Sequence, residues 1–152
     1  MEIFTNSEET GNTVLPGAYR GVILNINLSR GRTEIINTAQ YSSLYLGGRG
    51  IATALYYDHV PPECQAMDPE NSLIAMTGPL AGIPALGGSR WSLFAKSPAA
   101  YRRDHFCGGN LGGTFGAELK FAGLDGLIIT GRAECSSVIC ITGSRDAANP
   151  KN

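Results

Sequence analysis

The most informative stretch of the sequence is CGGNLGG at residues 107–113, which runs directly into TFGAELKFAG at residues 114–123. Four glycines surround Asn110, and a short helical pattern follows at once and ends at Gly123. Backbone N–H groups without neighbouring side chains and the positive end of a helix dipole both favour an anion such as a phosphate. The same pattern also suits a glycine-rich turn that lets a helix pack closely, and both interpretations stay open on these residues alone.

Length, composition and net charge limit the number of domains and the kinds of partner that this protein can have. The 152 residues are enough for one domain with a continuous core. Only 16% of them are charged, which indicates that a second domain, a partner chain or a cofactor covers part of the surface. The net charge is −1, and the one basic cluster is YRR at residues 101–103. This charge pattern argues against nucleic acid and anionic membrane as partners.

The sequence carries no targeting, membrane-spanning or metal-binding signal. The first residues are polar and lack the apolar region of a secretory signal, and no apolar run reaches the roughly 18 residues that a membrane span needs. Free thiols predict a reducing, cytoplasmic location, and the run VICI at residues 138–141 places Cys140 in the core. No C-x-x-C pair, and hence no zinc or iron–sulfur ligand set, is formed by Cys64, Cys107, Cys135 and Cys140.

Hydrophobic periodicity predicts an α+β fold with mixed β-sheets, short helices and glycine-rich loops, because strands and helices interleave without a regular βαβ alternation. We expect a flexible arm over 1–17, a domain over 18–143 and a polar tail over 144–152. Helices are predicted over 38–46, over 51–59 and after Gly113. Strands are predicted over 19–28 and 33–36 as a hairpin, and over 72–77, 90–95, 101–107, 126–130 and 137–142.

Three glycine-rich segments, at residues 47–50, 78–88 and 108–113, could together form a floor for a large polar ligand. Arg90 follows the second segment, where its guanidinium could hold a phosphate bidentately or form a surface ion pair. Arg49 is a weaker candidate, because an arginine in a loop is usually solvated or packed.

Acid–base chemistry has little support in the sequence. His59 and His105 have no Ser, Cys or carboxylate at motif spacing, so no nucleophile–base pair can be argued. Glu118 suits the start of its helix for electrostatic reasons and is not assigned to catalysis. The residues alone therefore predict a domain that holds a ligand rather than one that transforms it.

Six segments resemble the N-terminal domain of the aldehyde ferredoxin oxidoreductase family and occur in the same order as in that domain. Members of this family are tungsten or molybdenum bis-pterin enzymes. The segments are GVILNINLSRG (21–31), LGGRG (46–50), DPENSLI (68–74), TGPLAG (77–82), GGSR (87–90) and FGAELKFAG (115–123), with Asp125 and IITGRA (128–133) after them. The resemblance covers residues 20 to 140 and implies the fold of that domain.

The resemblance also implies a cofactor site. Arg90, Asn110, Gly112 and the adjacent Gly113 would contact the tungsto- or molybdo-bis-pterin. The backbone carbonyl of Asn110 would bind a magnesium ion that bridges the pterin phosphates. Between Lys96 and Asn110 the chain is a few residues longer than the family pattern, and this difference could shift the loop that carries Asn110.

Family members continue for several hundred residues, which supply the [4Fe–4S] cluster ligands and the surroundings of metal and substrate. The first hypothesis is therefore a pterin-binding base domain, inactive alone, that works with a larger subunit carrying the cluster and catalytic domains. That enzyme would oxidise an aldehyde to a carboxylic acid and pass electrons to ferredoxin. The alternatives are a non-catalytic truncated relative that binds a phosphate-bearing ligand or nothing, and a gene fragment without a function of its own.

Overall fold

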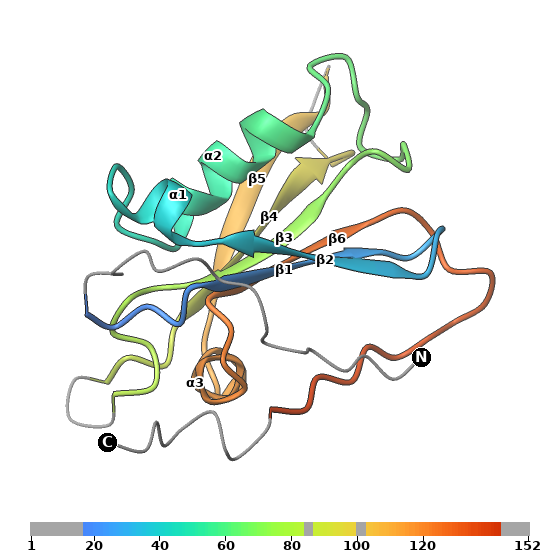
Figure 1. Cartoon of the computed structure of the whole chain (residues 1–152). Helices are drawn as coiled ribbons and strands as arrows, with labels where there is room; N and C mark the ends of the chain where they lie inside the picture. The colour runs from blue at the N-terminus through green and yellow to red at the C-terminus, as the bar shows by residue number, and fades with distance from the viewer. Residues whose placement is uncertain (1–16, 84–86, 100–102, 144–152) are drawn as a thin grey trace.

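The computed structural model describes residues 17–83, 87–99 and 103–143, and a six-stranded mixed sheet lies at its centre (Figure 1). The strand order is β2-β1-β6-β3-β4-β5. Strands β1 and β6 run parallel, and the other neighbouring pairs are antiparallel. The strands are β1 (Val22–Asn27), β2 (Arg32–Asn37), β3 (Leu73–Thr77), β4 (Trp91–Ser97), β5 (His105–Leu111) and β6 (Gly126–Thr130).

Helices cover both faces of this sheet. Helices α1 (Ala39–Ser42) and α2 (Arg49–His59) lie on one face, and α3 (Phe115–Phe121) lies on the other (Figure 1). Successive residues of a strand point to opposite faces, so Ile23 joins the core under α2 while Leu24 joins the core under α3. The sheet therefore separates two hydrophobic cores, and the predicted α+β class is confirmed.

The sequence predicted most elements of the first half of the chain. Strands β1 and β2 form the expected hairpin, with Val22 opposite Asn37. The helix expected over 38–46 is shorter and ends at Ser42. Thr38 precedes it without a side-chain cap, because its hydroxyl donates instead to the Asp125 carboxylate at 2.8 Å. A side chain distant in the sequence, Asp125, has thus become the hydrogen-bond partner of Thr38 in place of the backbone at the start of its own helix.

The glycine-rich stretch before α3 differs from the prediction. Residues 108–111 belong to strand β5, so Asn110 lies in a strand and only residues 112–114 form the turn into α3. A Cβ at position 108 would overlap the ring of Phe94 on the neighbouring strand β4. Gly108 thus permits close strand packing, which is a reason for glycine that the local sequence does not reveal.

The strand predicted over 137–142 is wrong, and so is the predicted burial of Cys140. Ile139 and Ile141 pack against the core under α3, whereas Val138 and Cys140 are exposed. The segment covers the edge of that core with alternate side chains, and its backbone forms an isolated β-bridge at Cys140 rather than a strand. Most of the predicted arm and the whole predicted tail lie outside the described residues, and none of the described helices is long and apolar enough to cross a bilayer.

Candidate functional site

The topology brings the three glycine-rich segments to one end of the sheet. Thr77 at the end of β3 lies opposite Trp91 at the start of β4, and Trp91 lies opposite Leu111 at the end of β5. The N–H of Gly48, just before α2, donates to the carbonyl of Thr77 at 3.0 Å. We call this region the glycine end; it comprises residues 47–50, 78–83, 87–90 and 110–114.

Close contacts fix the second segment on itself. The N–H of Gly82 donates to the carbonyl of Gly88 at 2.9 Å. A Cβ at position 88 would overlap the carbonyl oxygen of Leu80, so only glycine allows this approach. The loop therefore has a defined shape on both sides of residues 84–86, which lie outside the described part of the chain.

Other glycines at this end face open space. Among the described residues, and apart from the two chain neighbours, no atom lies within 4 Å of a Cβ placed at Gly78, Gly87, Gly112 or Gly113. Gly113 has a φ of 82°, which disfavours any other residue there. Within the described residues, the N–H groups of Gly113 and Thr114 donate no hydrogen bond to the protein. The glycine end thus presents bare backbone donors, as a large anionic ligand would need.

The aromatic pair Trp91 and Phe115 fixes the turn into α3. Their ring centroids lie 4.5 Å apart, and Trp91 Nε1–H donates to the carbonyl of Gly112 at 3.3 Å. A Cβ at Gly116 would lie 3.1 Å from the Cβ of Trp91, so the helix packs directly on β4. These contacts define where the backbone of residues 112–114 sits.

Asn110 and Arg90 lie close in the strand register. Asn110 pairs with Ser92, two residues after Arg90, and its Oδ1 accepts a hydrogen bond from Ser92 Oγ at 2.8 Å. Arg90 is exposed. The connection between β4 and β5 lies at the far end of these strands, beyond the pair of Ser97 and His105.

The remaining candidates lie apart or lack a chemical partner. Arg49 is the exposed first residue of α2, at the glycine end. His59 at the end of α2 and His105 at the start of β5 are exposed, and Glu118 is exposed on α3. Among the described residues, no group of three or more His, Cys, Asp or Glu side chains could hold a metal ion.

A buried ion pair that the sequence pattern did not lead us to expect lies beneath the glycine end. Lys120 and Asp125 form a salt bridge, with side chains 4% and 2% exposed. The Asp125 carboxylate also accepts N–H hydrogen bonds from Arg20 and Gly21, at 2.9 and 2.8 Å. Burial, with a smaller effect of the Asp125 charge, raises the pKa of the nearby Tyr19. The signal was available: Lys120 and Asp125 are the two charges in the apolar run LKFAGLDGLII.

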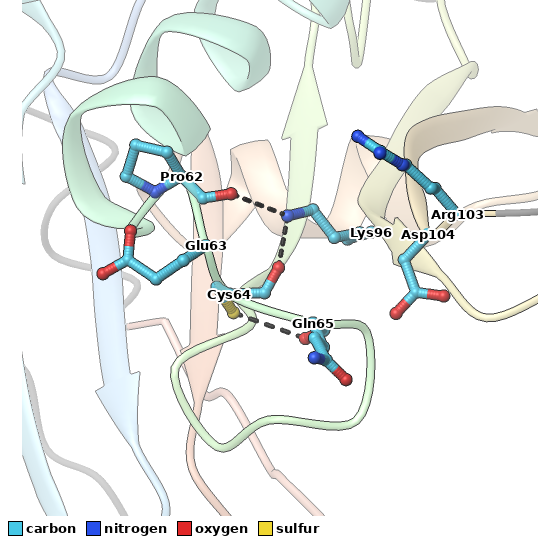
Figure 2. A pocket seen from close by; sticks show the side chains of 7 residues that line it. All are labelled: Pro62, Glu63, Cys64, Gln65, Lys96, Arg103 and Asp104. Carbon is cyan, nitrogen blue, oxygen red and sulfur yellow. Dashed lines mark hydrogen bonds between the residues drawn. The ribbon is translucent and has the colours of Figure 1, made fainter.

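A pocket of about 460 Å³ lies at the opposite end of β4 (Figure 2). Charged side chains that line it already form hydrogen bonds with backbone groups of the protein. Lys96 Nζ donates to the carbonyls of Pro62 and Cys64, and Asp104 Oδ2 accepts the N–H of Ala66 at 2.7 Å. Burial raises the pKa of the Cys64 thiol, which makes it a poor nucleophile. We interpret these contacts as an anchor for the loop that follows α2.

Comparison with known proteins matches the resemblance seen in the sequence. Residues 23–148 match the family model described as "Aldehyde ferredoxin oxidoreductase, N-terminal domain". The chain is 40% identical over 118 residues to the tungsten-containing aldehyde ferredoxin oxidoreductase of Pyrococcus horikoshii, covering 76% of this chain and 19% of that protein. The corresponding protein of Thermococcus kodakarensis is 37% identical over 115 residues, covering 75% and 18%.

More distant relatives have other names. The aliphatic sulfonate oxidoreductase, WOR-like subunit, of Pyrococcus furiosus is 33% identical over 121 residues, covering 77% of this chain and 19% of that one. Among solved structures, the active site complex BamBC of benzoyl coenzyme A reductase matches with a TM-score of 0.72 and 35% identity, covering 78% of this chain and 18% of that one.

The chain thus spans less than a fifth of the length of these relatives. The match to the family model extends over most of the sequence and includes all three glycine-rich segments and the Lys120–Asp125 pair. This chain belongs to the aldehyde ferredoxin oxidoreductase family and corresponds to its N-terminal domain.

Proposed function

We propose that the chain is the pterin-binding base domain of an aldehyde:ferredoxin oxidoreductase-type enzyme. Arg90, Asn110, Gly112 and Gly113 would hold a tungsto- or molybdo-bis-pterin, and the backbone carbonyl of Asn110 would bind the magnesium that bridges its phosphates. The observation that carries the proposal is the meeting of these residues at the glycine end, with Asn110 opposite Ser92 and Gly112 bonded to Trp91. The relatives named as tungsten-containing favour tungsten.

The geometry of the glycine end supports a large anionic cofactor. Open space over four glycines lets a bulky ligand approach the backbone, and the exposed Arg90 guanidinium suits a phosphate. Strand β5 is the last of the sheet that the described residues form, so its outer edge has backbone groups without a neighbouring strand in that part of the chain. A carbonyl on such an edge is a suitable ligand for a hard cation such as magnesium.

The chemistry would be shared between this chain and others. When bound, the metal–pterin group supplies the two-electron oxidation of an aldehyde to its carboxylic acid. The described residues would provide binding and orientation, because they place backbone donors and the exposed Arg90 guanidinium at the glycine end. We infer that a larger subunit carries the catalytic residues and a [4Fe–4S] cluster that passes electrons to ferredoxin, and that this chain is inactive alone. Its free cysteines favour a reducing cytoplasm for this assembly.

Apolar side chains around the glycine end support such a covering subunit. Leu44 and Leu46, just before the first glycine segment, are each 79% exposed. Leu80 and Phe115, from the second segment and the start of α3, are 50% and 41% exposed. Apolar residues gathered beside a binding site are typical of a surface that another protein part covers.

The test is anaerobic purification from the cells that naturally make the protein, with metal analysis and mass spectrometry of released ligands. We expect tungsten or molybdenum, a pterin and a larger co-purifying chain. Arg90→Ala should lower the pterin content at least about tenfold, as expected for loss of a charged contact. Arg32→Ala, on the exposed strand β2, is the matched control and should retain the pterin. A nucleotide or another phosphate compound without metal would contradict the proposal and favour a non-catalytic relative.

A further inference from the structure

We propose that Asp125, paired with Lys120, is the positioning residue that holds all three glycine segments in place at the glycine end. What those segments bind rests on the proposed function, whereas their being held rests on contacts within the described chain. Asp125 begins no element and faces no open site, and its side chain is 2% exposed. Its role is therefore to act through the residues that it contacts.

The carboxylate of Asp125 joins segments that are far apart in the sequence. It accepts hydrogen bonds from the N–H groups of Arg20 and Gly21, which lead into β1. It also accepts the hydroxyl of Thr38, at the start of α1, and it binds the ammonium of Lys120. Each of these donors is buried or partly buried, so the carboxylate is fully used inside the protein.

The backbone carbonyl of Asp125 reaches the first two glycine segments. It accepts both the N–H of Thr77 at 3.0 Å and the Thr77 hydroxyl at 2.7 Å. Thr77 is the last residue before the second segment, and its own carbonyl accepts the N–H of Gly48 in the first. A shift of Asp125 would thus move Thr77, and through it both segments.

Through Lys120, the ion pair also reaches the second and third glycine segments. Lys120 lies in the last turn of α3, and its Nζ also donates to the carbonyl of Ala18 at 2.9 Å. A Cβ at Gly82 would lie 3.7 Å from the Cβ of Lys120, so the second segment rests on this helix. The other end of α3 leads back to Gly112 through the contact between Phe115 and Trp91.

Loss of an ordinary buried ion pair would destabilise the whole fold evenly. Loss of a positioning residue would loosen the glycine segments more than the rest of the fold. Removing one partner leaves an unpaired buried charge and can prevent folding. The informative variants are therefore the double variant K120M/D125N, which leaves no buried charge, and T77V, which removes only the hydroxyl bond to Asp125. T77S keeps that hydroxyl and is the matched control. Ile23→Val, in the core under α2, is the control for general destabilisation.

Hydrogen exchange followed by mass spectrometry, together with the emission of Trp91, would test the proposal on the chain without added cofactor. Relative to the core strands, T77V should raise exchange about tenfold at residues 47–50 and 78–83 and leave residues 112–116 unchanged, as loss of one buried hydrogen bond predicts. K120M/D125N should raise exchange in all three segments and shift the Trp91 emission. T77S should restore the protection.

The proposal is overturned if exchange in the glycine segments rises no more than in Ile23→Val at equal global stability. It is also overturned if T77V and T77S behave alike. Pterin content, measured separately in the assembled enzyme, distinguishes the two proposals. Looser segments in a chain whose wild type carries no pterin would support the positioning role and reject the proposed function.

Discussion

Trp91 and Gly112 are joined by a hydrogen bond from the indole Nε1 to the glycine carbonyl, at 3.3 Å. The bond crosses from the start of β4 to the residue after β5, so one side chain fixes the turn that leads into α3. Trp91 is also the only tryptophan in the sequence, which makes its emission a reporter of this turn.

Replacing Trp91 by Phe should therefore loosen the turn at the glycine end. The ring remains able to contact Phe115, but the donor to Gly112 is lost. We expect the free energy of unfolding to fall by about 1 kcal/mol, as for a typical hydrogen bond. Circular dichroism in urea would measure it. An unchanged midpoint would show that the hydrogen bond contributes nothing to stability.

The sequence predicted the parts of the fold whose pattern is local. Alternating residues gave the β1–β2 hairpin, and the run FGAELKF gave α3. The sequence predicted a strand over 101–107, but it missed residues 108–111 of strand β5 because the reason for Gly108 lies on another strand, at Phe94. The role of Asp125 was missed because its donors at Arg20 and Thr38 are 105 and 87 residues away. Such contacts have no signature within a sequence window.

The two neighbouring glycines of β5 should respond very differently to alanine. A Cβ at Gly108 would overlap the Phe94 ring, whereas a Cβ at Gly109 would meet no atom of the described chain within 4 Å. Gly108→Ala should destabilise the domain by about 1–3 kcal/mol, as overpacking does. Gly109→Ala should leave stability within about 0.5 kcal/mol. Urea unfolding of both variants gives the comparison, and equal effects would contradict the packing described for β5.

The cysteines should separate into one protected thiol and three reactive ones. Cys64 is 5% exposed and burial raises its pKa, while the other three are exposed. Brief treatment of the native chain with iodoacetamide should add three labels, at Cys107, Cys135 and Cys140, and unfolding in urea should allow a fourth. Intact mass and peptide mapping would identify them. Early labelling of Cys64 would contradict its placement under the loop after α2.

Alkaline pH should weaken the fold through buried tyrosines. Burial, with a contribution from Cys64, raises the pKa of Tyr56 from 10.0 to about 12, and the Lys96 backbone N–H opposes this shift. The folded state thus favours the neutral phenol. The contribution of Tyr56 to the free energy of unfolding is therefore fully present below pH 10 and is lost as the pH rises towards 12.

Unfolding in urea at several alkaline pH values would test this. Tyr56→Phe cannot ionise, so its stability should fall less steeply with pH than that of the wild type. Burial and the hydrogen bond to Asp58 raise the pKa of Tyr41 to about 12. Tyr41 remains in both proteins, so it contributes equally to the pH dependence of each. Parallel curves would show that Tyr56 ionises as freely in the folded state as in the unfolded chain.

Gly112 offers a way to separate binding from stability at the glycine end. Among the described residues, a Cβ there would meet no atom within 4 Å beyond its chain neighbours, so Gly112→Ala should leave the free energy of unfolding within about 0.5 kcal/mol. If the pterin lies against this backbone, the added methyl group would occupy its space. We expect less pterin in the purified assembly, measured as released pterin per chain. Gly109→Ala, equally open but outside the proposed site, should retain the full amount. Equal pterin content in the two variants would remove Gly112 from the cofactor site.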